Sequence, residues 1–67
     1  MTIDLGKKIK SLRHSAGLTQ EQLAQKLSVT PQAVSKWESG TSMPDIQLLP
    51  ELSVALGTSI DALFSLT

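Results

Sequence analysis

Four residues between positions 31 and 36 have the types and spacing needed to contact the edges of DNA base pairs. A helix would place them on one side and leave the apolar residues of the segment on the other; they are Pro31, Gln32, Ser35 and Lys36. Gln32 can bond an adenine through its N6 and N7 atoms, and Lys36, one turn later, can reach a guanine or a phosphate. Ser35 discriminates weakly between bases. Ordinary solvated helix faces have the same composition, so this pattern needs support from the surrounding elements.

That support comes from the segment Thr19–Gly40, which reads as two short helices joined by a tight turn over Ser28–Thr30. Thr19 and Gln22 have the spacing of a capping box, which predicts the start of the first helix. Pro31 suits the first position of the second helix. A second helix with a polar, exposed start is the arrangement that places side chains in the major groove. Val34 and Trp37 form its apolar stripe, so we expect Trp37 in the core rather than stacked on bases.

The remaining sequence predicts helices on either side of this unit. Asp4 can cap a first helix, which ends where Gly17 takes a left-handed conformation. Its apolar residues at helical spacing are Leu5, Ile9, Leu12 and Ala16. A turn over 45–47 followed by a regular helix from about Leu48 would place Pro50 in a tolerated first-turn position. That helix directs Leu49, Leu52, Ala55 and Leu56 inward and ends at Gly57, and Ser59 caps a last short helix with Ile60, Leu63 and Phe64. No segment shows the alternation of a strand, so we expect an all-α fold of about five helices forming one domain over residues 1–67.

Composition excludes several other classes of protein. The 67 residues include one histidine and no cysteine, which argues against a disulfide framework or a conventional zinc site, and no cofactor is expected. No apolar run approaches the roughly 18 residues of a membrane span, so a cytoplasmic protein without membrane contact is expected. The net charge is zero, but all six lysine and arginine residues precede Trp37. This polarity would let only one part of the molecule attract an anionic partner.

Five polar residues at helix ends are candidates for contacts with backbone phosphates. They are Thr19, Gln20, Ser39, Thr41 and Ser42. The amino-terminal N–H groups of a helix beginning near Thr19 form a natural anion site, although ordinary helix capping also explains Thr19. We hypothesise that Arg13 and Glu38 form a bidentate ion pair between the first helix and the end of the third; the alternative is two independent surface charges. His14 receives no role, and Met43 is expected to pack within its loop.

The order of these motifs resembles the XRE-type helix-turn-helix family, which includes the DNA-binding domains of lambdoid phage repressors and Cro proteins. The resemblance rests on motifs that together extend over nearly the whole chain: Ile9…Leu12-Arg13, Gly17–Ala24, Val34–Gly40, Pro44 and Leu52…Leu56-Gly57. It implies a five-helix lambda-repressor-like domain whose second and third helices bind DNA. It further implies that Gln20 and the four residues of the exposed stripe face the DNA, and that Arg13 and Glu38 form a structural ion pair.

The sequence departs from the family pattern at three places, which affect backbone strain, base reading and the salt dependence of binding. Ser28 stands where relatives often have glycine, which costs on the order of 1 kcal/mol if φ is positive. Pro31 replaces a residue able to read a base, and the loop at 41–43 lacks lysine and arginine. Few cations predict a shallow dependence of DNA affinity on salt concentration.

The leading hypothesis is a transcriptional regulator of the repressor type that binds double-stranded DNA as a homodimer on an inverted repeat. Leu63, Phe64 and Leu66 could form the dimer contact or could equally cover the core. The competing hypothesis is a protein-interaction module that kept the fold without DNA binding, motivated by the neutral charge. An enzyme is disfavoured because the sequence shows no nucleophile–base pairing or phosphate loop, and no small-molecule ligand is evident.

Overall fold

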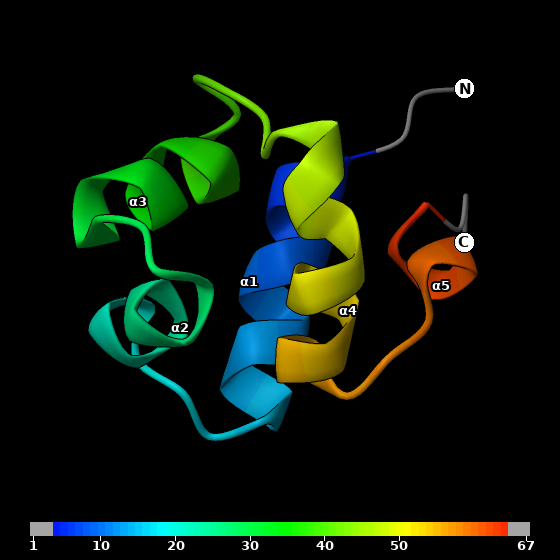
Figure 1. Ribbon diagram of the computed structural model, residues 1–67. Coiled ribbons are helices and arrows are strands. Elements are labelled where there is room, and N and C mark those ends of the chain that lie inside the picture. Colours follow the sequence, from blue (N-terminus) through cyan, green and yellow to red (C-terminus); the bar gives the residue numbers. More distant parts are fainter. Residues whose placement is uncertain (1–3, 65–67) are drawn as a thin grey trace.

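The computed structural model describes residues 4–64, and this part of the chain contains helices and no strands (Figure 1). The helices are α1 (Leu5–Ser15), α2 (Gln20–Leu27), α3 (Pro31–Ser39), α4 (Leu49–Leu56) and α5 (Ile60–Leu63), and a 3-10 turn, η1 (Ile46–Leu48), precedes α4. This arrangement confirms the expected all-α fold with five α-helices. Leu66 lies outside the described residues.

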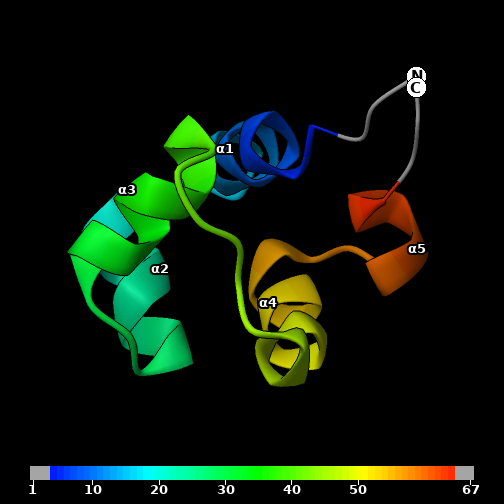
Figure 2. The same ribbon diagram turned by 90° about the horizontal axis from the view of Figure 1, so that it is seen from above.

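The helix α1 packs against α3, α4 and α5. In two views at right angles, α2 and α3 lie to one side of α1, and α5 lies to the other side (Figures 1 and 2). The helix α4 lies between α2 and α5 (Figure 2). The most extensive contacts are those of α3 with α1 and with α2. The predicted DNA-reading helix is therefore supported from two directions, which fixes its orientation.

Side-chain caps begin the helices at the positions that the sequence predicts. The Asp4 carboxylate accepts a hydrogen bond from the Lys7 N–H at 3.0 Å. Thr19 and Gln22 form the reciprocal capping box: the Thr19 backbone N lies 2.9 Å from Gln22 Oε1, and the Gln22 backbone N lies 3.0 Å from Thr19 Oγ1. Thr30 caps α3 through the Ala33 N–H at 3.2 Å. These bonds satisfy backbone donors that have no partner within the helix.

The segment around Pro50 also folds as expected. Asp45 accepts a hydrogen bond from the Gln47 N–H at 2.8 Å and opens the short turn η1. The regular helix α4 then begins at Leu49, so Pro50 falls in its first turn. At this position the missing proline N–H removes no helical hydrogen bond. Gly57 ends α4 in a left-handed conformation, with φ of 68°.

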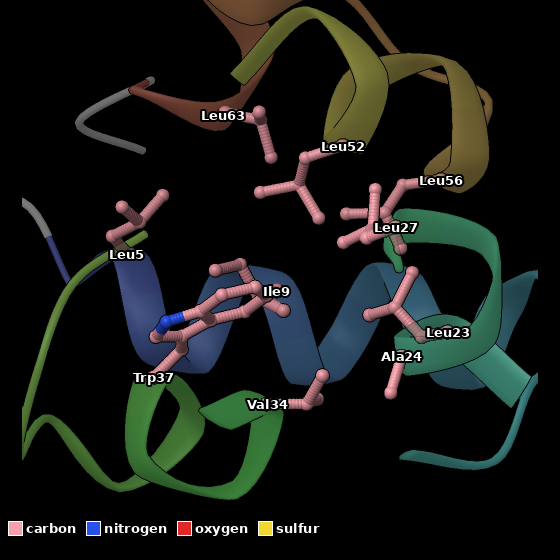
Figure 3. Packing of buried hydrophobic residues seen from close by; sticks show 10 residues of the cluster. All are labelled: Leu5, Ile9, Leu23, Ala24, Leu27, Val34, Trp37, Leu52, Leu56 and Leu63. Atoms are coloured by element: carbon pink, nitrogen blue, oxygen red, sulfur yellow. The ribbon is translucent and has the colours of Figure 1, made fainter. Parts of the chain in front are cut away.

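All five helices contribute to one hydrophobic core (Figure 3). Its buried members are Leu5, Ile9, Leu23, Ala24, Leu27, Val34, Trp37, Leu52, Leu56 and Leu63. Trp37 is only 5% exposed, which confirms its predicted place in the core. Leu63 is completely buried, so this residue covers the core and is not exposed for a dimer contact.

Three apolar residues differ from their expected environment. Ala16 is exposed because α1 ends at Ser15 and Ala16 forms its carboxyl-terminal cap. Met43 is 68% exposed and does not pack closely within its loop. Ile60, the first residue of α5, is 38% exposed, and the core contact of α5 comes chiefly from Leu63. Leu12, Leu49, Ala55 and Phe64 are partly buried against the core.

Two positions show unusual backbone requirements. A Cβ atom at Gly6 would overlap the Trp37 carbonyl oxygen and lie 2.9 Å from that of Glu38, so glycine is required where α1 meets the end of α3. The sequence analysis did not single out Gly6. Ser28 has a φ of 57° and is the only non-glycine residue with positive φ between positions 4 and 64. The expected left-handed strain at Ser28 is thus present.

Candidate nucleic-acid interface

The helix α3 has one buried and one exposed face, as the sequence predicts. Val34 and Trp37 point into the core, and Ala33 is half-buried beside them. The exposed face carries all four residues predicted to contact bases: Pro31, Gln32, Ser35 and Lys36. Within the described part of the chain, the side chains of Gln32 and Lys36 form no hydrogen bond or ion pair, so their polar groups are available to a ligand.

A buried ion pair ties α3 to α1. Arg13 Nε and Nη2 donate to the two carboxylate oxygens of Glu38 at 2.7 and 3.1 Å. This is the bidentate geometry expected from the sequence. Arg13 Nη1 also donates to the Leu18 carbonyl oxygen at 2.8 Å, so the guanidinium holds the loop between α1 and α2 as well. The side chains of Arg13 and Glu38 are only 8% and 4% exposed.

Gln20 joins the same network, which the sequence analysis did not predict. Its amide Nε2 donates to Glu38 Oε1 at 3.1 Å, linking the first residue of α2 to the end of α3. We refer to Arg13, Gln20 and Glu38 as the clamp. Gln20 is also a predicted phosphate contact; one Nε2 hydrogen is used on Glu38, and the amide has a second donor for another acceptor. Its backbone N–H, at the start of α2, is the group better placed for an anion.

The charge of Glu38 is stabilised by its surroundings. Burial opposes ionisation, but hydrogen bonds from Arg13 and Gln20 and the positive charges of Arg13 and Lys10 outweigh it. The result is a pKa below the ordinary glutamate value. The clamp is therefore an ionised, hydrogen-bonded unit at neutral pH, and it holds α1, α2 and α3 in fixed relation.

Hydroxyl groups gather where α3 ends. Ser39 Oγ donates to the Lys36 carbonyl oxygen at 3.1 Å and lies 2.8 Å from Thr41 Oγ1. Since each hydroxyl has one proton, the Ser39 proton is used on the helix and Thr41 becomes the donor between them. A phosphate contact from Thr41 requires a rotation of its hydroxyl. Ser42 is exposed and its hydroxyl has no hydrogen-bond partner within residues 4–64.

Other kinds of site are not evident in this part of the structure. Between residues 4 and 64 there is no group of three or more histidine, cysteine, aspartate or glutamate residues able to hold a metal ion. No helix in the same range is long and apolar enough to span a membrane. His14 is exposed, and its Nε2 lies 3.1 Å from Arg13 Nη2.

A family model described as "Helix-turn-helix" matches residues 9–63, which include the clamp and the exposed face of α3. The chain belongs to this helix-turn-helix family. The matched range covers every one of the five α-helices at least in part, so the family assignment and the fold agree.

Proteins similar to this helix-turn-helix chain include a transcriptional activator and a repressor. It is 41% identical to the HTH-type transcriptional activator BcrR of Enterococcus faecalis, over 94% of this chain and 31% of BcrR. The crystal structure of the P22 c2 repressor in complex with a synthetic operator matches with a TM-score of 0.84 and 31% identity, over 91% of this chain and 92% of the repressor.

The same fold also occurs inside a larger enzyme. Hydroxypropylphosphonic acid epoxidase from S. wedmorenis matches with a TM-score of 0.83 and 30% identity, over 94% of this chain but 34% of the epoxidase. The chain likewise spans 31% of BcrR and 54% of the transcriptional regulator YonR of Bacillus subtilis. The likeness therefore concerns a domain-sized part of these proteins.

Proposed function

We propose that this chain is a sequence-specific DNA-binding domain of a transcriptional regulator, which inserts the start of α3 into the major groove. Gln32 and Lys36 are the principal base contacts, with Ser35 as a weaker one and Pro31 as an apolar contact. The backbone N–H groups at the start of α2 and the hydroxyls of Ser39, Thr41 and Ser42 bind flanking phosphates. Thr19 orders the start of α2 through its capping box.

The observation that carries this proposal is the exposed polar face of α3 on a helix that is rigidly held. The residues on that face retain free donors and acceptors, while the clamp and the core fix the helix on its other sides. Base recognition requires side chains placed within hydrogen-bonding range of fixed base edges, so this rigidity serves the function. The likeness to an operator-bound repressor supports the same orientation.

We further propose that the regulator binds as a homodimer and represses by covering a promoter or operator. One domain of this size buries too little surface for tight binding, whereas two domains on half-sites about 10 bp apart bind together. Since Leu63 is buried, a dimer contact falls to other apolar residues. The large apolar side chains that are exposed within residues 4–64 are those of Met43, Ile46, Val54 and Ile60. The relatives include both an activator and a repressor.

The test is a pair of substitutions on the exposed face of α3. The variant with Gln32→Ala and Lys36→Ala should lose specific DNA binding and keep its helical circular dichroism, because both side chains are exposed and unpaired. Each good base contact contributes about 1–3 kcal/mol of discrimination, so the two together predict at least a tenfold loss. Lys26→Ala, in the last turn of α2 and outside the exposed face of α3, is the matched control. Equal binding by the double variant and the control would refute the proposed face.

A second candidate function is a protein-interaction module. The observation in its favour is the zero net charge together with a loop at 41–43 that has no cation. In that case the double variant would retain a protein partner, and the wild type would bind no duplex at any salt concentration. An enzymatic role is not proposed, because the epoxidase shares this fold over only about a third of its length.

A further inference from the structure

A pocket of about 220 Å³ lies between the start of α1 and the loop that follows α3. Its apolar walls are formed by the side chains of Leu5, Trp37, Met43 and Pro44. Gly6 packs against the Trp37 backbone at the same place, which holds α1 close to the end of α3. Because the two walls come from segments that are distant in the sequence, no local sequence pattern predicts this pocket.

The indole N–H of Trp37 is a hydrogen-bond donor without a partner. It donates to no group within residues 4–64, although the residue is only 5% exposed. In the same range, every fully buried side-chain nitrogen or oxygen has a partner, so the indole nitrogen is reached from outside. The nitrogen end of the ring lies on the side of Leu5, which also lines the pocket (Figure 3). Since a buried indole N–H usually has an acceptor, a molecule in the pocket is the source of one.

The polar side chains of the pocket restrict the chemistry of that molecule. They belong to Asp4 and Ser42, both exposed, and no lysine or arginine is among the described residues that line the pocket. The Asp4 carboxylate therefore disfavours an anion. An ammonium group has no acceptor to offer the Trp37 N–H. A neutral molecule with an oxygen acceptor and an apolar body satisfies both conditions.

We propose that this pocket binds a small neutral molecule, whose carbonyl oxygen accepts the hydrogen bond of the Trp37 N–H and whose apolar body contacts the walls. Ligand pockets typically combine apolar walls with a few polar groups, and those for drug-sized molecules reach about 300–1,000 Å³. At about 30 Å³ per water molecule, this pocket has the volume of roughly seven waters. It therefore suits a compact cyclic ketone or cyclic amide. The inference does not depend on the proposed function, because the pocket is separate from the exposed face of α3.

The competing explanation is that the pocket holds only solvent and that water is the acceptor of the Trp37 N–H. The two explanations differ in how the N–H responds to a neutral carbonyl compound. A binding site fills, so the response reaches a plateau as the compound is added. Solvent contact alone gives a response that rises in proportion to concentration.

The experiment follows the indole N–H signal of the isotope-labelled protein by two-dimensional NMR. Trp37 is the only tryptophan, so the chain gives a single signal of this kind. The probes are caprolactam and cyclohexanone, which are neutral and have one carbonyl group on an apolar ring. We expect a saturable shift of the signal, with half-saturation on the order of 1 mM for ligands this small. Cyclohexanecarboxylate has a similar ring but is an anion, and it should bind more weakly.

Met43→Ala and Val54→Ala are the matched variants. Both side chains are exposed, at 68% and 80%, so neither change should unfold the protein, but only Met43 lines this pocket. Met43→Ala should weaken binding by about fourfold for each methylene contact that is lost, and Val54→Ala should leave it unchanged. A shift that rises without saturation for both neutral probes would overturn the inference. Equal affinity in the wild type and in Met43→Ala, or equal affinity for cyclohexanecarboxylate, would overturn it as well.

Discussion

Replacement of Glu38 by alanine is expected to destabilise this domain severely. The variant leaves the guanidinium of Arg13 buried, at 8% exposure, without its counter-charge. It also removes three hydrogen bonds, which come from Arg13 Nε, Arg13 Nη2 and Gln20 Nε2. Loss of one partner of a buried ion pair costs about 3–5 kcal/mol.

That loss is large for a chain of this length. At about 0.05–0.15 kcal/mol per residue, 67 residues give a free energy of unfolding of roughly 3–10 kcal/mol. Glu38→Ala should therefore leave a substantial fraction of the protein unfolded at 37 °C. The same substitution should weaken DNA binding indirectly, since the clamp sets the position of α2 and α3 relative to α1.

The assay is urea denaturation followed by the fluorescence of Trp37, the only tryptophan in the chain and a core residue. The control replaces the whole ion pair, by Arg13→Met with Glu38→Leu, and should cost less than Glu38→Ala because no charge stays buried. A cost below about 1 kcal/mol for Glu38→Ala, within the range of exposed ion pairs, would refute the reasoning. A double variant that is less stable than Glu38→Ala would do the same.

Three further changes test separate features. Gly6→Ala should lower the free energy of unfolding by about 1–3 kcal/mol, because the new Cβ overlaps the Trp37 carbonyl oxygen. Helix propensity alone predicts that alanine would stabilise α1 instead. A raised unfolding temperature would contradict the close packing. Ser28→Gly should raise stability by up to about 1 kcal/mol by relieving its positive φ, with Ser28→Ala as the control that gains nothing. The pKa of Glu38 is lower in the folded state than its ordinary value near 4.3, so its contribution to stability is present above that pH and is lost as pH falls through the folded pKa. The difference in free energy of unfolding between wild type and Glu38→Gln, measured by urea denaturation, should therefore shrink in acid. A difference that grows as pH falls would contradict a lowered pKa of Glu38.

Much of the fold could be predicted because its helix ends have local signals. The capping box of Thr19 and Gln22 is a contact within four residues, and Pro50 restricts where α4 can become regular. The burial of Val34 and Trp37 followed from their spacing in a short helix. Each of these features depends on residues that are neighbours in the sequence, where propensity and pattern act directly.

The features that were missed depend on contacts between distant segments. Gly6 is required only because α1 meets the backbone of Trp37, about thirty residues later. The amide of Gln20 donates one hydrogen bond to Glu38, 18 residues away, a contact that the sequence did not reveal. Ala16 was placed on the apolar face by its spacing, but α1 ends before that spacing applies. A sequence pattern shows which residues share a face and does not show which partner that face meets.

The measurement that tests the central claim most directly is selection of bound duplexes from a random-sequence pool at near-physiological salt. We expect enrichment of an inverted repeat with half-sites about 10 bp apart, as two copies of α3 in successive major grooves require. The double variant with Gln32→Ala and Lys36→Ala should enrich no such sequence. Absence of enrichment by the folded wild type, persisting at low salt, would contradict DNA recognition by the exposed face of α3.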